Sequence, residues 1–151
     1  MQLEILINND IKSAMLARDK EKLNALRAIK AALLMEKTGK DVVAGEIPES
    51  VELKVLQKLV KQRNEAAAIY RDKGRPELAE EEEFQAKIIQ AYLPEQMNET
   101  EVEAVVRQVV EEISATGMKD MGRVMGMVTK QLAGKADNRL VSKIVRDLLS
   151  N

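Results

Sequence analysis

Apolar residues recur at three- and four-residue spacing along most of this 151-residue chain. One such row fits a single face of an α-helix without a miss, and it consists of Val102, Val105, Val106, Val109, Val110 and Ile113. No segment combines sustained strict alternation with β-branched residues and hairpin turns. The sequence therefore predicts an all-α protein, because rows of this period are buried by helices and not by strands.

Side chains that cap helix N-termini precede four of the predicted helices, and they are Asp19, Asn98, Asp120 and Asp137. Their oxygens accept hydrogen bonds from the free backbone N–H groups of a first helical turn. Asn98 is followed three residues later by Glu101, which is the pattern of a capping box. Residues 39–48 have no strong period, and we expect a loop there.

Glycine and proline mark the predicted helix ends. Gly74 and Gly117 are expected to end the third and fifth helices, because glycine readily takes the left-handed conformation found there. Pro94 cannot continue a helix and restricts the residue before it, so it is the strongest boundary in the chain. We expect an N-terminal four-helix domain, residues 1–93, followed by a small three-helix domain, residues 94–151.

The basic residues concentrate near the C-terminus. Residues 116–151 contain seven Lys and Arg against three Asp, a net charge of +4 in a chain of net charge −1. In the last predicted helix, Arg139, Lys143 and Arg146 fall within about 60° of each other, opposite the apolar half. Such a row suits phosphate oxygens, because cations neutralise the backbone and release counterions. An ordinary solvated face is the alternative, and composition alone favours it.

Gly122 and Gly126 stand one turn apart inside the sixth predicted helix, where each costs about 1 kcal/mol relative to alanine. A neighbouring helix that crosses very closely is the simpler reason for the pair. The other is the approach of an RNA sugar-phosphate backbone. On the RNA interpretation, the binding residues are Lys119, Arg123, Lys130, Lys135, Arg139, Lys143 and Arg146, together with Gly122 and Gly126.

No constellation of residues amounts to an active site. The chain has no His and no Cys, which excludes Ser-His-Asp and Cys-His nucleophiles, the usual zinc sites and iron–sulfur clusters. Gly134-Lys135 is not a phosphate loop, because Thr129 stands where the first glycine is needed and Ala136 replaces the Ser/Thr. The acidic run 80–83 points around its helix instead of converging on one ion. We therefore predict no catalytic residue, no metal and no cofactor.

The lack of cysteine and the lengths of the apolar runs indicate where the protein is located. The lack of cysteine fits a reducing cytoplasm. The only apolar run at the N-terminus, Ile5-Leu6-Ile7, is far shorter than a signal-peptide core. No apolar run is long enough to cross a bilayer, so no membrane association is expected.

Five short motifs, taken together and in this order, resemble the GatB/YqeY family. They span essentially the whole chain and are Asp19-Lys20-Glu21-Lys22-Leu23 leading to Leu26-Arg27, Lys61-Gln62-Arg63, Tyr92-Leu93-Pro94-Glu95-Gln96, Asp120-Met121-Gly122-Arg123-Val124-Met125-Gly126 and Gly134-Lys135-Ala136-Asp137. Two positions depart from the family pattern. Asn138 stands where glycine is usual, and Lys22 replaces a common arginine, which keeps the charge but loses the bidentate fork.

The resemblance implies a function in translation. Free-standing members of the family resemble the C-terminal portion of the GatB subunit of the glutamine-dependent, tRNA-dependent amidotransferase, which helps to hold the tRNA. The ATP-dependent chemistry of that enzyme, a carbon–nitrogen ligase, belongs to a separate domain with no counterpart in this chain. The implied function is therefore tRNA or RNA binding as an accessory module without its own catalytic centre. The alternative is a helical protein–protein adaptor that docks on an aminoacyl-tRNA synthetase or an amidotransferase. The oligomeric state is not specified by the sequence.

Overall fold

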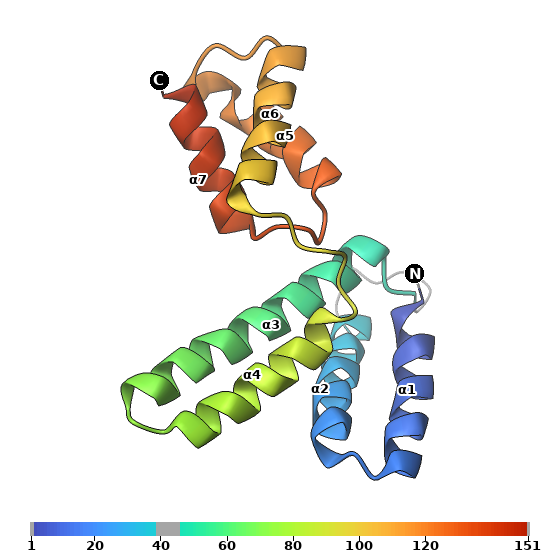
Figure 1. Ribbon diagram of the computed structural model, residues 1–151. Helices are drawn as coiled ribbons and strands as arrows, with labels where there is room; N and C mark the ends of the chain where they lie inside the picture. The colour runs from blue at the N-terminus through green and yellow to red at the C-terminus, as the bar shows by residue number, and fades with distance from the viewer. Residues whose placement is uncertain (1, 39–45, 151) are drawn as a thin grey trace. The chain divides into compact units, whose positions relative to one another are not determined.

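Helices account for all the regular structure in residues 2–38 and 46–150, which are the residues that the computed structural model describes (Figure 1). In chain order the α-helices are α1 (Leu3–Ala17), α2 (Lys20–Lys37), α3 (Glu49–Asp72), α4 (Pro76–Gln90), α5 (Glu99–Glu112), α6 (Met121–Gln131) and α7 (Asn138–Leu149), and a 3₁₀ turn, η1 (Met118–Asp120), precedes α6. No strand occurs in these ranges. The all-α prediction is confirmed for them. The predicted loop 39–48 is described only from residue 46 onward.

The chain divides into two compact units, Met1–Leu93 and Pro94–Asn151. The first contains α1 to α4 and the second α5 to α7. That each unit folds as a domain of its own stays a prediction. Among the described helices, none is long and apolar enough to cross a membrane.

The first unit consists of two antiparallel helix pairs, α1 with α2 and α3 with α4 (Figure 1). Helix α2 contacts both α3 and α4, and its apolar row supplies the centre of the core. The core side chains are Leu3, Ile7, Ala14, Ala25, Leu26, Ile29, Leu33, Val55, Leu56 and Ile89. They come from the helical rows visible in the sequence, because each helix buries the face on which its apolar residues recur.

Polar contacts hold the ends of these helices. Asp19 accepts a hydrogen bond from the Lys22 N–H at 3.2 Å, which confirms Asp19 as the N-cap of α2. The Tyr92 hydroxyl donates to the Asp10 carboxylate, so the end of the α4 segment is tied to α1. Burial and the negative charge of Asp10 both raise the pKa of Tyr92, so this phenol stays a donor at any physiological pH.

Glu52 is the buried polar side chain of the described residues, with 3% of its surface exposed. Its Oε2 accepts a hydrogen bond from the Leu3 N–H at 2.8 Å. Leu3 is the first residue of α1, so the carboxylate satisfies one of the amides that have no partner within that helix. Burial raises the pKa of Glu52, whereas the Leu3 hydrogen bond and the positive charge of the chain's N-terminus lower it, and the charge of Glu49 raises it.

The second unit is an arrangement of α5, α6 and α7 (Figure 1). Valines from these three helices supply most of its buried core. The capping box is confirmed: Asn98 Oδ1 accepts from the Glu101 N–H at 2.8 Å, and Glu101 Oε1 accepts from the Asn98 N–H at 3.2 Å. Asp137 accepts from the Arg139 N–H at 2.9 Å, which confirms it as the N-cap of α7.

The predicted end of α5 at Gly117 was wrong. The helix ends at Glu112, and Ser114 takes the left-handed conformation with φ 53°. The Ser114 N–H donates to the Glu111 carbonyl and the Ala115 N–H to the Val110 carbonyl, which together make a Schellman motif. Gly117 lies in extended backbone instead. Gly74, by contrast, ends α3 with φ 73°, as expected.

Asp120 does not cap α6 in the predicted way. Its side chain makes no capping hydrogen bond to that helix, and its Oδ2 accepts from the Thr116 N–H at 2.9 Å. That bond, the Gly117 N–H and the cations Arg123 and Lys119 hold the pKa of Asp120 below its ordinary value. The carboxylate therefore closes the turn from 116 to 120, and the Met121 N–H at the start of α6 donates to the Met118 carbonyl of η1.

Replacing Glu52 by glutamine is expected to stabilise the protein at about pH 8 by about 1 kcal/mol, because a neutral amide costs less to bury than a carboxylate and still accepts from Leu3. The folded-state pKa of Glu52 lies above the unfolded-state value. Protonated Glu52 therefore contributes to the free energy of unfolding. This contribution is fully present below the unfolded-state pKa and is lost as the pH rises through the folded-state pKa. The advantage of Glu52→Gln should shrink toward about pH 4. Urea unfolding across this range measures it, and a pH-independent difference would contradict the assignment.

Candidate nucleic-acid interface

Helix α7 has two opposite faces. Its apolar side packs on the core of the second unit, where Val141, Ile144, Val145 and Leu149 are buried. Arg139, Lys143 and Arg146 are exposed. The separation follows from the sequence, because residues three or four apart share a side of a helix. Because the apolar side of α7 is buried against α5 and α6, these three cations face solvent.

The three cations line one hollow of about 480 Å³, together with Met125, Asn138 and Ser142. Met125 belongs to α6, and the other lining residues belong to α7. Met125 is partly buried against the core of the unit, so it gives the hollow an apolar wall. The sequence did not single out Ser142 as a lining residue. Its position four residues before Arg146 could have indicated it, because the two share one side of the helix.

No carboxylate lies within ion-pair distance of Arg139, Lys143 or Arg146 among the described residues. The Arg146 Nη2 donates weakly to Ser142 Oγ at 3.4 Å, which holds the guanidinium along the helix. No acidic residue lines the hollow. Three cations so close together repel one another, and an anion bridging them would relieve that repulsion. This hollow is hereafter called the α7 groove.

The other predicted RNA-binding residues do not line the α7 groove. Lys119 is exposed in η1, and Lys130 is exposed in the last turn of α6. Arg123 pairs with Asp120 at 3.6 Å, and 65% of its side-chain surface is exposed. A pair this open to water adds little stability. These residues surround the two glycines of α6 but are not part of the hollow.

Lys135 belongs to a structural turn between α6 and α7. Gly134 takes φ 74°, and its carbonyl accepts from Gln96 Nε2 at 2.7 Å. The Lys135 carbonyl accepts from the Met97 N–H at 2.8 Å. The segment before α5 is thereby fastened to this turn, and the Lys135 side chain stays exposed. The Gly134-Lys135 pair lies in the turn that follows the end of α6 at Gln131, in agreement with the rejection of a phosphate loop.

Close helix crossing does not explain Gly122 and Gly126, and that expectation was wrong. Both glycines are exposed, and a Cβ built on either would meet no described atom within 4 Å. The open backbone therefore faces solvent. Gly122 lies three residues before Met125, on the side of α6 that reaches the α7 groove. The approach of a ligand backbone stays a prediction.

Three of the four methionines near these glycines pack against the core of the second unit. Met121, Met125 and Met127 are partly buried against the core of the second unit, whereas Met118 is 45% exposed.

Among the described residues, no group of three or more Asp or Glu is arranged to hold a metal ion.

Residues 5–149 match the sequence model of the family described as Yqey-like protein. Two similar curated proteins are named "Altered inheritance of mitochondria protein 41, mitochondrial". The one from Pyrenophora tritici-repentis is 30% identical over 144 residues, which cover 93% of this chain and 77% of that protein. The one from Meyerozyma guilliermondii is 29% identical over 125 residues, which cover 81% of this chain and 64% of that protein.

A third similar protein comes from Thermococcus gammatolerans and is named as a subunit of glutamyl-tRNA(Gln) amidotransferase. It is 29% identical over 121 residues, which cover 80% of this chain but only 18% of that protein. The similarity is therefore to one part of a much longer protein.

Because the space around the α6 glycines is open, alanine at these positions is expected to stabilise the protein. The double substitution Gly122→Ala with Gly126→Ala should raise the free energy of unfolding by about 1–2 kcal/mol, because alanine favours a helix interior by about 1 kcal/mol per position. Urea unfolding of the full chain measures this. The control is Gly74→Ala, which should lower stability because that position has φ 73°. A loss of stability in the double variant would show that the helix face is not open.

Proposed function

The chain belongs to the family of Yqey-like proteins, and on that premise we propose that its second unit binds tRNA or another RNA through the α7 groove. The protein acts as an accessory module for glutamine-dependent aminoacyl-tRNA amidotransferase, a carbon–nitrogen ligase. It has no catalytic centre of its own and uses no cofactor. The observation that supports RNA binding most is the row of Arg139, Lys143 and Arg146, which shares one hollow without a carboxylate among the described residues.

Phosphate chemistry fits this row. Side chains at positions 139, 143 and 146 follow one side of α7, so successive cations are about 5–6 Å apart along the helix. Successive phosphates of a nucleic-acid strand can therefore meet successive cations. Arg139 and Arg146 can hold phosphate oxygens bidentately, and Lys143 adds a point charge between them. Such contacts position an RNA without reading its sequence.

The glycine face of α6 extends the proposed surface. The exposed backbone at Gly122 and Gly126 lets a sugar-phosphate approach the helix closely. Lys119, Arg123, Lys130 and Lys135 are exposed cations that supply additional phosphate contacts. If one strand contacts both areas, Gly122→Ala with Gly126→Ala weakens RNA binding while it stabilises the free protein.

The link to amidotransferase rests on similarity. The glutamyl-tRNA(Gln) amidotransferase protein from Thermococcus gammatolerans is 29% identical to this chain over 121 residues. The chain matches only 18% of that protein, so the amide-forming reaction is not transferred to it. We propose that this protein supplies the RNA-holding part to an enzyme built from other chains, such as an amidotransferase or a synthetase.

Two further expectations belong to the proposal. The units 1–93 and 94–151 fold as separate domains, four helices followed by three. The protein works in a reducing compartment, and the cytoplasm is the location that the sequence favours. The mitochondrial location in the names of two relatives applies to those proteins.

Reversing the charge of the row tests RNA binding. The triple variant Arg139→Glu, Lys143→Glu, Arg146→Glu should weaken binding of bulk tRNA by about tenfold or more in fluorescence anisotropy at about 50 mM salt. The slope of log affinity against log salt should become shallower by about 3, because about three phosphate contacts are removed.

A matched variant controls for net charge. Lys12, Lys20 and Lys30 are cations of the first unit that lie outside the proposed surface, and changing all three to glutamate alters the net charge by the same amount. This variant should keep most of the affinity. Equal losses in both variants would show only nonspecific attraction, and the absence of tRNA binding by the wild type would refute the proposal.

A protein–protein adaptor is the second candidate, and exposed apolar side chains of the first unit favour it. Ile5 is 56% exposed, Leu34 61% and Met35 74%. Pull-down from lysate with and without RNase separates the candidates, because an adaptor keeps its synthetase or amidotransferase partner after the RNA is digested. The RNA-binding proposal predicts that recovery of such partners depends on intact RNA.

A further inference from the structure

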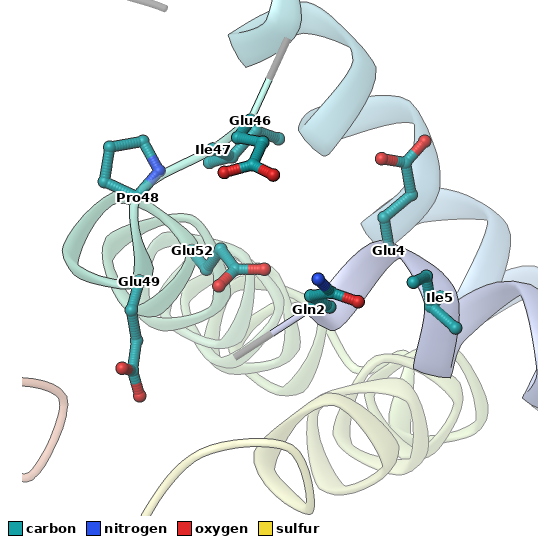
Figure 2. Close-up of a pocket in the computed structure, with 8 residues that line it drawn as sticks. All are labelled: Gln2, Glu4, Ile5, Glu46, Ile47, Pro48, Glu49 and Glu52. Atoms are coloured by element: carbon teal, nitrogen blue, oxygen red, sulfur yellow. The ribbon is translucent and has the colours of Figure 1, made fainter. Parts of the chain in front are cut away.

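A second hollow lies in the first unit, far in sequence from the α7 groove. Its volume is about 500 Å³, and it lies between the start of α1 and the start of α3 (Figure 2). The lining residues are Gln2, Glu4, Ile5, Glu46, Ile47, Pro48, Glu49 and Glu52. Four of them are acidic and none is basic. This hollow is hereafter called the acidic pocket.

Glu52 forms the floor of the acidic pocket, and only 3% of its surface is exposed. Its carboxylate points into the space between Gln2 and the segment 46–48 (Figure 2). One oxygen, Oε2, accepts from the Leu3 N–H at 2.8 Å. The other, Oε1, is buried and has no hydrogen-bond partner among the described residues. Native proteins rarely leave such an atom unsatisfied, because its desolvation is not offset.

The fold itself would have tolerated a neutral group here. A glutamine would accept the same Leu3 hydrogen bond without burying a charge. Burial raises the pKa of Glu52, and the positive charge of the chain's N-terminus offsets this only in part. A cationic donor placed in the pocket at Oε1 would supply the missing hydrogen bond and further positive charge.

The other three carboxylates differ in their surroundings. Glu4 pairs with Lys37 at 2.5 Å, so its charge is already balanced. The Glu49 carboxylate points away from the centre of the pocket, whereas the Glu46 carboxylate faces it (Figure 2). Glu46 has no ion pair among the described residues. Glu52 and Glu46 are therefore the two groups available to a ligand.

This arrangement does not suit a bare metal ion. Hard divalent cations need several oxygen ligands that converge on one point, and no group of three or more acidic residues in the described chain has that geometry. The pocket is also partly apolar, because Ile5, Ile47 and Pro48 line it. A suitable ligand has a charged donor for Glu52 and an aliphatic part for these side chains.

We propose that the acidic pocket binds a small aliphatic amine, with its ammonium group donating to Glu52 Oε1 and its alkyl chain lying against Ile5, Ile47 and Pro48. A second ammonium at the far end of a diamine reaches Glu46. An ammonium offers three donors, so it can satisfy Oε1 and still bond Gln2 or water. The volume of about 500 Å³ accommodates a chain of several carbons.

Titration of the full-length protein with 1,5-diaminopentane tests this site, by calorimetry and by saturation-transfer NMR. Glu52→Gln should weaken binding by about tenfold or more, because it removes a charge-assisted hydrogen bond in a buried place. Glu46→Gln should weaken binding of the diamine more than binding of pentylamine, which has no second ammonium. Circular dichroism and urea unfolding check that both variants fold.

Matched probes and a matched variant make the result decisive. Glu65→Gln removes one exposed negative charge elsewhere on α3 and should leave the affinity unchanged. The neutral 1,5-pentanediol should not bind, and Nα-acetyl-lysine methylamide should bind more weakly than the diamine. The proposal is overturned by absent diamine binding, by equal losses in Glu52→Gln and Glu65→Gln, or by tighter binding of the lysine compound. Binding of Mg²⁺ or Ca²⁺ without binding of the diamine would overturn it as well.

Discussion

The packing of α7 against α5 and α6 is the constraint on which the candidate interface depends. Val141, Ile144 and Val145 are buried with the valines of the neighbouring helices, and each such side chain contributes about 1.5–3 kcal/mol by leaving water. A helix held by one side has no freedom to turn the other inward. Arg139, Lys143 and Arg146 are therefore kept in solvent by the core, and not by contacts of their own. The Asp137 cap fixes where this helix begins, and the helical period sets which residues share each side.

Much of the fold could be predicted from sequence because local rules decide it. The cap at Asp19 and the capping box of Asn98 and Glu101 are contacts over three residues, and Pro76 starts α4 at the position where its missing N–H costs nothing. The end of α5 could not be predicted in this way. Ser114 takes the left-handed conformation that is usually taken by glycine. A rule based on residue type therefore places the end of the helix at the nearby Gly117, which is too late.

The candidate site was predictable in part, for the same reason. The row on α7 follows from helical spacing, whereas the wall of the groove requires knowing which residue of α6 lies beside it. Met125 could not be assigned to the groove from sequence, because the crossing of two helices is a tertiary property. The space beside Gly122 and Gly126 is also tertiary, and the structure alone shows that no described helix fills it. The charged residues that line the two hollows have opposite signs. No acidic residue lines the α7 groove, and no basic residue lines the acidic pocket.

An NMR titration of the ¹⁵N-labelled full-length protein with tRNA can locate RNA binding in the α7 groove, because it reports on backbone amides along the whole chain in one experiment. If RNA binds in the α7 groove, the shifted amides should concentrate on the exposed side of α7, residues 138–146, and on α6 around Met125. The chemical shifts of amides in the buried part of α5, and of amides in α1 and α2, should not change. Shifts confined to the first unit, or spread evenly over all exposed basic residues of the chain, would contradict the assignment of RNA binding to the α7 groove.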